Sequence, residues 1–164
     1  MKYLRKFNES KKLVFGQNDE DDDLELVDED ESGFLYLDDS NITGAGTGLF
    51  TAIDIEDGEL ISKYIGEVIS DKEAERRIKN GEDQYFMNDP VTGKIFDCKR
   101  KEGFAKYSND AYRTKFRNNA KIALVKKRGK YGIYLQAIRN IKAGSEILTS
   151  YGSAYWKKHG KNIK

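Results

Sequence analysis

The sequence predicts a mainly β domain made of short strands, with one short helical insert. From Gly33 onward the apolar residues occur in runs of a few positions, and glycine, asparagine and aspartate separate these runs. The chain has 164 residues, which suits one domain of ordinary size and is too short for two substantial ones. The runs predict strands at eight places: 34–37, 48–53, 60–64, 84–87, 95–96, 121–125, 132–137 and 146–148.

The breaks between these runs carry the residues that turns need. Glycine is the second residue at five of them, and glycine adopts the left-handed backbone of tight turns without steric cost. Only 71–80 is predicted to be helical, because Asp71 stands at its start and Gly81 follows its end. Turns are predicted at 43–44, 57–58, 92–93, 128–129 and 143–144.

The first 32 residues differ in charge from the rest of the chain. Residues 19–31 contain ten acidic residues and no basic one, whereas 1–18 carry a net charge of +4 and 32–164 a net charge of +7. Like charges close together repel and favour a solvated chain, so we predict a flexible leader over 1–32 and one domain over 33–164. In a second interpretation, the acidic run docks on the basic domain or recruits a basic partner.

Composition excludes several classes of protein. No apolar run approaches the roughly 20 residues of a membrane span, and the N-terminus lacks the apolar stretch of a secretory signal. Cys98 is the only cysteine, which excludes an internal disulfide or a multi-cysteine zinc cluster, and no metal site is predicted. His159 is the only histidine and lies in a basic tail, so we expect it to be solvated and do not expect Ser–His or Cys–His catalysis. We expect a soluble intracellular protein with no membrane partner, and its oligomeric state stays open.

Four segments carry candidate motifs. The first, Gly44-Ala45-Gly46-Thr47-Gly48, fits a ligand loop or a plain hairpin turn equally well, and it lacks the helix that follows a dinucleotide-binding fingerprint. The other three are YIGEV at 64–68, GFAKYSND at 103–110 followed by NNA at 118–120, and GSEILTSYG at 144–152 followed by Tyr155-Trp156.

In this order, over about residues 33–156, the four segments resemble the SET-domain family of protein lysine methyltransferases. The family's landmarks are G-x-G, Y-x-G-E, R-[FY]-x-N-H-S followed by an asparagine, and E-L-x-x-x-Y-G. The resemblance implies the β-clip fold of SET domains, in which the C-terminal segment makes a knot-like crossing beneath a loop, here about 104–119. It implies a compact form without flanking zinc-binding cysteine clusters. The matching positions are 46–48, 64–67, 106–110 with Asn119, and 146–152.

The resemblance also implies the chemistry. The protein would be a protein-lysine N-methyltransferase that uses S-adenosylmethionine and acts on an exposed lysine of a protein substrate, histones being familiar targets of the family. Backbone at Gly46 and Gly48 would approach the cofactor where a side chain would collide. The implied catalytic residues are Tyr151 and Tyr64. The implied substrate channel consists of Tyr64, Thr149 and Tyr85. The implied cofactor-binding residues are Gly46, Thr47, Gly48, Asn109, Asp110 and Trp156.

Departures from the family pattern keep two alternatives open. Asp110 replaces the usual histidine, Lys106 replaces the usual arginine, and Thr149 replaces an aromatic residue that often limits how many methyl groups fit. One alternative is therefore a SET-like binding module without turnover. The other is a nucleic-acid-binding domain, because 99–130 carries twelve bases against two acids with aromatic residues interleaved, although solvated strands and loops explain these charges as well.

Overall fold

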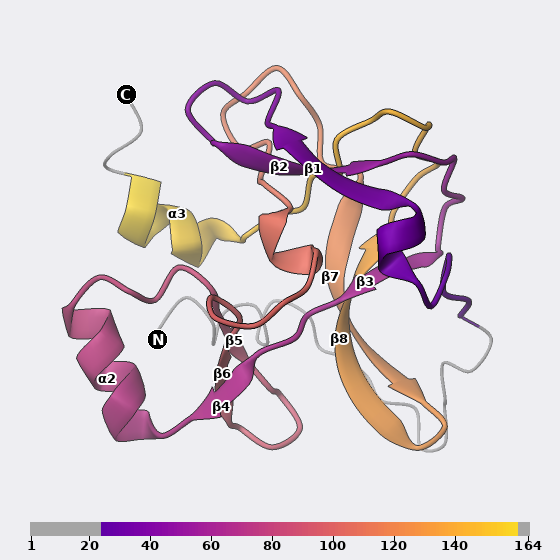
Figure 1. Cartoon of the computed structure of the whole chain (residues 1–164). Helices are drawn as coiled ribbons and strands as arrows, with labels where there is room; N and C mark the ends of the chain where they lie inside the picture. The colour runs from indigo at the N-terminus through magenta and orange to yellow at the C-terminus, as the bar shows by residue number, and fades with distance from the viewer. Residues whose placement is uncertain (1–23, 161–164) are drawn as a thin grey trace. The chain divides into compact units, whose positions relative to one another are not determined.

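The computed structural model describes residues 24–160 (Figure 1). These residues form two compact units. The larger unit contains 24–64 and 103–150, and the smaller unit contains 65–102 and 151–160. Both units are built mainly from short antiparallel strands, which confirms the predicted fold class. Among the described residues, no helix is long and apolar enough to cross a bilayer.

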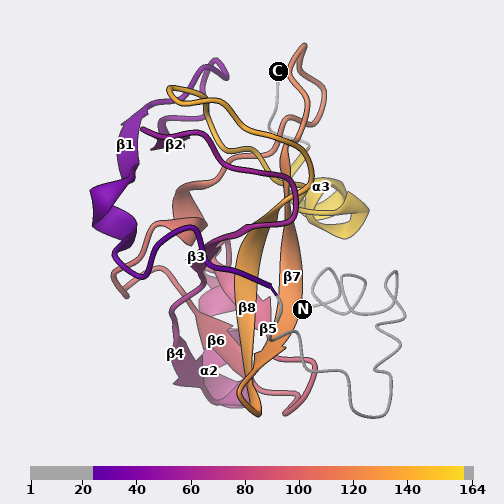
Figure 2. The same ribbon diagram turned by 90° about the vertical axis from the view of Figure 1, so that its right-hand side faces the viewer.

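Two sheets form the larger unit. Strands β1 (Leu35–Asp39) and β2 (Thr47–Thr51) pair antiparallel, while β3 (Leu60–Lys63), β8 (Lys130–Ala137) and β7 (Ala120–Lys127) form a sheet in that order. The β7–β8 hairpin pairs along its whole length and closes at Arg128 and Gly129, as the turn prediction requires (Figure 2). Two short 3-10 helices, η1 (Glu31–Gly33) and η2 (Ala105–Tyr107), belong to this unit. Its core is aliphatic, with Leu49, Ile55, Leu60, Ile61, Val125, Leu135 and Ile147 fully buried.

The last segment of the larger unit lies against the loop that precedes β7. Asn109 forms a parallel bridge with Leu148, and Ala120 forms one with Thr149. The Asn119 side chain accepts from the Leu148 N–H and donates to the Glu146 carbonyl, both at 2.9 Å. Residues 146–149 are thus bonded to both ends of the loop, which are the contacts that the predicted crossing needs.

The smaller unit contains one sheet and two α-helices. Strands β4 (Glu67–Ile69), β6 (Ile95–Asp97) and β5 (Phe86–Asn88) are antiparallel in that order, and the helices are α2 (Asp71–Lys79) and α3 (Ser153–His159). Helix α2 follows Ser70, whose hydroxyl accepts from the Glu73 N–H at 3.1 Å and caps the first turn. The core of this unit combines Ile69, Ala74, Phe86 and Ile95 with Ile78, Ala154 and Tyr155.

A buried arginine joins α2 to the sheet of the smaller unit. Arg77 is 5% exposed and donates to Glu67 (2.8 Å), Glu73 (2.7 Å) and Asp97 (2.7 Å). These carboxylates raise the pKa of Arg77, and the guanidinium groups of Arg76 and Arg77 lower the pKa of Glu73 to about 2. The positive charge of Arg77 is therefore balanced by carboxylates from α2, β4 and β6.

Three details of the secondary structure were predicted wrongly. The strand expected at 146–148 consists instead of isolated bridges, because Glu146 pairs with Phe50 while Leu148 pairs with Asn109. Strand β4 was missed because it has only three residues, of which Val68 is 66% exposed, so its sequence has no clear alternation. Helix α3 contradicts the expectation of a single helix. It begins directly after Gly152, whose φ is +86°.

Residues 24–31, which the sequence prediction assigns to the leader, bond to the edge of β3. The Val27 N–H donates to the Leu60 carbonyl (3.0 Å), and the Leu60 N–H donates to the Glu25 carbonyl (2.9 Å). The Glu31 carboxylate accepts from the Ser62 hydroxyl at 2.8 Å and from the backbone of Lys63 at 3.0 Å. The domain boundary at residues 32 and 33 stays a prediction, and the leader before residue 24 lies outside the described residues.

Candidate functional site

The glycine-rich loop links β1 to β2 and is joined to a buried carboxylate. Glu146 is 5% exposed, although it lies about a hundred positions further along the chain. Its Oε1 accepts from the Ser40 hydroxyl at 2.6 Å, and its Oε2 accepts from the Asn41 N–H at 2.8 Å. The carboxylate therefore fixes the start of the loop, since two of its donors precede the glycines.

The two motif glycines have different structural roles. At Gly48 an added Cβ would lie 2.4 Å from the Glu146 Oε1 and 3.2 Å from the Phe50 ring, so the protein itself leaves no room for a side chain. At Gly46 the φ is +72° and, apart from Gly46 and its two chain neighbours, no atom of the described residues lies within 4 Å of an added Cβ. Contacts inside the protein thus explain the glycine at position 48, and no ligand is needed to explain it. At Gly46 the backbone faces open space, so a ligand could approach it there.

Asn109 joins the loop from the segment before β7. Its Nδ2 donates to the Thr47 carbonyl at 3.0 Å and lies 3.4 Å from the Glu146 Oε1. With the NH₂ group directed at these oxygens, no described residue donates to the Asn109 Oδ1. The larger unit therefore presents a carbonyl acceptor beside the open backbone of the glycine loop, which is the kind of surface that an ammonium-bearing ligand needs.

Asp110 replaces the histidine of the family pattern and closes the base of the next loop. The residue is 7% exposed, and its Oδ1 accepts from the Tyr112 N–H (2.9 Å) and from the Asn118 Nδ2 (3.0 Å). The Asn118 Oδ1 in turn accepts from the Ala111 N–H at 2.9 Å. The substitution therefore places a hydrogen-bonded carboxylate where the family has an imidazole.

Tyr64 and Thr149, both predicted for the substrate channel, are buried in the larger unit. Tyr64 follows β3, is 9% exposed, and donates its N–H to the Ile133 carbonyl at 2.8 Å. Thr149 is fully buried and donates its N–H to the Asn109 carbonyl at 2.9 Å. Within the part of the chain that the structure describes, its hydroxyl has no hydrogen-bond partner. Thr149 thus brings a small, polar side chain to the position where the family often has an aromatic ring.

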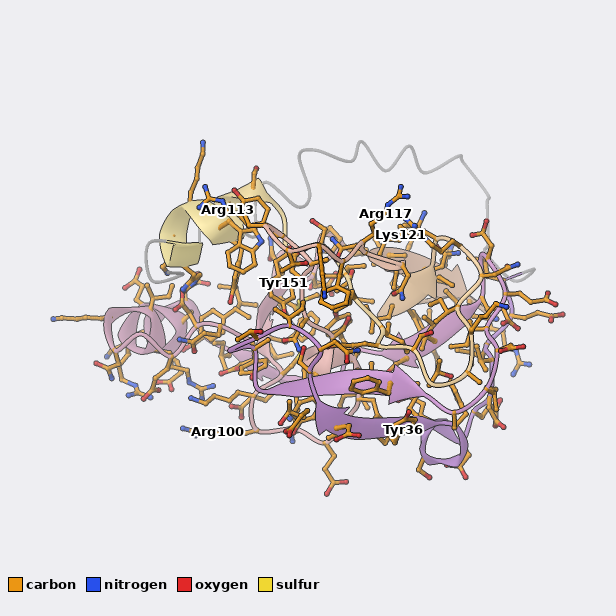
Figure 3. All side chains as sticks on the ribbon, turned by 90° about the horizontal axis from the view of Figure 1, so that it is seen from above. Tyr36, Arg100, Arg113, Arg117, Lys121 and Tyr151 are labelled. Carbon is orange, nitrogen blue, oxygen red and sulfur yellow. The ribbon has the colours of Figure 1, made fainter. Side chains whose placement is uncertain are left out.

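The other predicted site residues lie in the smaller unit. The Tyr151 ring, labelled in Figure 3, stacks on Trp156 with centroids 6.0 Å apart and meets Tyr155 edge to face at 4.7 Å. Tyr85 is 36% exposed, and its carbonyl accepts from the Cys98 N–H at 3.0 Å. The predicted residues are therefore divided between the units: Tyr85, Tyr151 and Trp156 belong to the smaller one, and the glycine loop, Asn109, Asp110, Tyr64 and Thr149 to the larger one.

The end of α3 carries the only histidine of the chain. Burial lowers the pKa of His159, the nearby Lys158 lowers it further, and Asp83 opposes both effects. Asp83 is 1% exposed and pairs with the Lys158 ammonium, which ties α3 to the segment before β5. The sequence prediction of a solvated histidine is therefore wrong, because this imidazole is partly buried against Tyr155 at 4.5 Å between ring centroids.

Sequence reasoning missed the carboxylate and the polar residues that organise the glycine loop. Glu146 was part of a recognised motif, but no role was assigned to it. Its partners Ser40 and Asn41 lie in a polar stretch after β1, and such a stretch indicates only a turn. Glu146 itself could have indicated these contacts, because a charged residue beside apolar ones needs hydrogen-bond or ion-pair partners when it is buried.

The sequence model of the SET domain matches residues 46–152 of this chain. The histone-lysine N-methyltransferase EZH2 of Chaetomium thermophilum is 33% identical over 132 residues, which cover 74% of this chain and 8% of that protein. A mouse histone-lysine N-methyltransferase, H3 lysine-36 specific, is 28% identical over 110 residues, covering 65% of this chain and 4% of that protein. The chain thus spans less than a tenth of the length of either relative.

Solved structures give the same likeness. This chain aligns with a structure of the Polycomb Repressive Complex 2 of Chaetomium thermophilum at a TM-score of 0.62 and 28% identity. That complex is in an autoinhibited conformation and is bound to S-adenosylmethionine. The alignment covers 78% of this chain and 16% of that one. An active polycomb repressive complex 2 in the basal state aligns with a TM-score of 0.61 and 30% identity, covering 73% of this chain and 15% of that one.

Proposed function

The chain belongs to the SET-domain family, and on this premise we propose that it is an S-adenosylmethionine-dependent protein-lysine N-methyltransferase. One observation carries the proposal: the glycine loop, Asn109 and Glu146 come from three separate family motifs and are joined by hydrogen bonds. The names of the relatives, which are histone-lysine N-methyltransferases, support the same activity.

The larger unit has groups suited to the cofactor. S-adenosylmethionine carries an ammonium group, a carboxylate and a sulfonium, and when bound it would supply the methyl group. The Asn109 Oδ1 would accept from the ammonium, and the open backbone at Gly46 and Thr47 would allow close approach to the methionine part. Gly48 and Asp110 would act through their backbone.

The remaining residues would prepare the substrate amine. A lysine ammonium has a pKa near 10.4, so its deprotonation at neutral pH costs roughly 4–5 kcal/mol. A narrow channel at the buried Tyr64 would disfavour the charged form by desolvation and let a proton leave to water. The Tyr151 hydroxyl would then orient the neutral amine, since alignment supplies much of the rate in such transfers. The small Thr149 would leave room for more than one methyl group.

We propose that the substrate is a protein with an exposed lysine in a basic segment, such as a histone. The names of the relatives point to this class of substrate, and an intracellular location follows from it. The catalytic domain would span 33–164 and the leader 1–32. In this arrangement the acidic run at 19–31 would attract basic substrates to a basic domain.

The proposal is tested by incubating the full chain with S-adenosylmethionine and a panel of lysine-rich proteins that includes core histones. Mass spectrometry of the products gives the activity, the target lysine and the number of methyl groups together. We expect methyl groups on lysine alone. Cofactor binding in calorimetry without any transfer would instead assign the chain to the inactive binding modules. Absence of binding at millimolar cofactor would overturn both assignments.

A further inference from the structure

We propose that the loop before β7 is a binding surface for the phosphate backbone of nucleic acid. This basic loop, defined as residues 111–121, joins Asp110 to β7, includes the first two residues of that strand, and extends beyond it (Figure 2). Figure 3 labels three of its basic residues along the upper edge of the view. Its four bases are all exposed: Arg113, Lys115, Arg117 and Lys121.

The positive charge of the basic loop is not neutralised locally. Residues 111–121 contain no acidic residue. None of the four bases forms an ion pair with a carboxylate of residues 24–160. Asp110, the neighbouring acid, is buried and directs its Oδ1 to the Tyr112 N–H and to Asn118. Ordinary solvated surfaces intersperse both signs, so four unopposed bases on one short loop favour a polyanionic partner.

Aromatic rings in the basic loop favour nucleic acid over an acidic peptide. Tyr112 is 42% exposed, and the guanidinium of Arg113 lies over its ring at 5.1 Å. Lys115 lies over the Phe116 ring at 5.4 Å. A charged group paired with an aromatic ring can contact a phosphate and an unpaired base together, whereas an acidic peptide would use only the charge.

The backbone of the basic loop is held in a defined conformation. The Ala111 carbonyl accepts from the N–H (3.0 Å) and the hydroxyl (2.8 Å) of Thr114, whose hydroxyl in turn accepts from the Phe116 N–H at 3.1 Å. Asn118 closes the base of the loop through Asp110 and Ala111. Little backbone entropy would be lost on binding, which lowers the cost of association.

The basic loop begins two residues after Asn109. Its last residues include Asn119, whose side chain bonds to the backbone of Glu146 and Leu148. A nucleic acid held here would lie beside the motifs to which the proposed function assigns the cofactor. The surface would then direct the proposed enzyme to lysines of proteins that are themselves bound to nucleic acid.

The test measures fluorescence anisotropy of the full chain with a labelled duplex DNA, and with single-stranded DNA and RNA of the same sequence, over a range of salt. The variant Arg113→Gln/Lys115→Gln/Arg117→Gln/Lys121→Gln is compared with a control of equal charge change. That control replaces four exposed lysines outside the loop with glutamine: Lys72, Lys79, Lys94 and Lys142. Circular dichroism and urea unfolding verify that both variants fold.

We expect the wild type to bind at least one of the three probes. If it binds the duplex, a plot of the logarithm of the binding constant against the logarithm of the salt concentration should have a slope that is smaller in magnitude by about 3–4 in the loop variant. The control variant should keep at least half of the wild-type slope. Equal losses in the two variants would overturn the assignment to the loop. Absence of binding to every probe at low salt, or displacement by poly-glutamate as effective as by unlabelled nucleic acid, would overturn the proposal itself.

A further variant separates stacking from simple charge attraction. Tyr112→Leu should weaken binding to the single strands more than binding to the duplex, because only unpaired bases stack on a side chain in this way. Equal affinity of this variant and the wild type for single strands would refute the aromatic part of the argument. None of these measurements contains S-adenosylmethionine, so their failure would leave the proposed methyl transfer standing, and the reverse also holds.

Discussion

The Glu146 carboxylate occupies the space that a side chain at Gly48 would need. The Oε1 lies 2.4 Å from the position of an added Cβ, and the same oxygen accepts from the Ser40 hydroxyl. The glycine of the family motif is therefore required by a contact inside the protein. Because Asn109 also reaches this oxygen, one carboxylate sets the positions of three motifs.

Gly48→Ala should displace Glu146 and weaken the glycine loop. The added methyl group meets both a carboxylate and the Phe50 ring, and overpacking of this kind costs about 1–3 kcal/mol in the free energy of unfolding. Urea unfolding measures this loss, and calorimetry should show weaker S-adenosylmethionine binding. Gly33→Ala is the matched control, since its Cβ would meet nothing nearer than 3.8 Å. Equal effects of the two substitutions would contradict the crowding at Gly48.

Glu146→Gln keeps the size of the side chain but exchanges one acceptor oxygen for a donor. Either the Asn41 N–H or the NH₂ of Asn109 then faces another donor, so we expect a loss of roughly 1–3 kcal/mol in unfolding free energy. Cofactor affinity should fall in the same variant. Glu75→Gln, on the exposed face of α2, serves as the control and should leave both quantities unchanged. Wild-type stability in the Glu146 variant would refute its organising role.

Arg77→Met should be among the most damaging substitutions in the smaller unit. It leaves Asp97, whose side chain is 2% exposed, as a buried charge without its arginine, and loss of one partner in such a pair costs about 3–5 kcal/mol. Urea unfolding followed by tryptophan fluorescence reports on this unit through Trp156. Arg76→Met removes only the ion pair on the solvent side of Glu73, so a far smaller effect is expected. Comparable losses in both variants would rule out a special contribution from burial.

His159 should titrate below its ordinary pKa of 6.5. Because the folded state disfavours the imidazolium, its contribution to stability is complete above pH 6.5 and is partly lost as the pH falls from there through the lowered pKa. Proton NMR measures the pKa directly, since the chain has a single histidine. The same titration in concentrated urea supplies the unfolded reference. A folded pKa at or above that reference would show that burial does not control this group.

Tyr151→Phe should strongly reduce methyl transfer and preserve cofactor binding. The substitution removes the hydroxyl but keeps the ring that packs on Tyr155 and Trp156, so the smaller unit should remain intact. Loss of a single well-placed hydrogen-bonding group at a reacting centre lowers turnover by about 10²–10³-fold. Tyr131→Phe removes a hydroxyl from an exposed tyrosine of β8 and should have no such effect. Unchanged turnover in the Tyr151 variant would end the role proposed for it.

The predictable parts of the fold were those with a local cause. Strands β7 and β8 were found because their apolar runs flank an Arg-Gly turn, and α2 was found because its acidic start and the following glycine are both visible in sequence. Helix α3 was missed because its aromatic residues pack on one another and on the core of the smaller unit, which no local pattern reveals. The Asn109–Thr47 and Glu146–Ser40 bonds join residues far apart in the chain. The order of the motifs therefore predicted that these segments belong to one site, but it could not predict which atoms bond to one another.

The partners of Glu146 also impose an order on biosynthesis. Ser40 leaves the ribosome 106 residues before the carboxylate that holds it. At about 5–20 residues per second, the glycine loop therefore waits roughly 5–20 s for its partner. By the end of that interval the nascent chain contains three of the four motifs but not yet the carboxylate that joins them. Assembly of the loop therefore has to wait for residue 146, and a chain truncated before that residue would have no means of completing it.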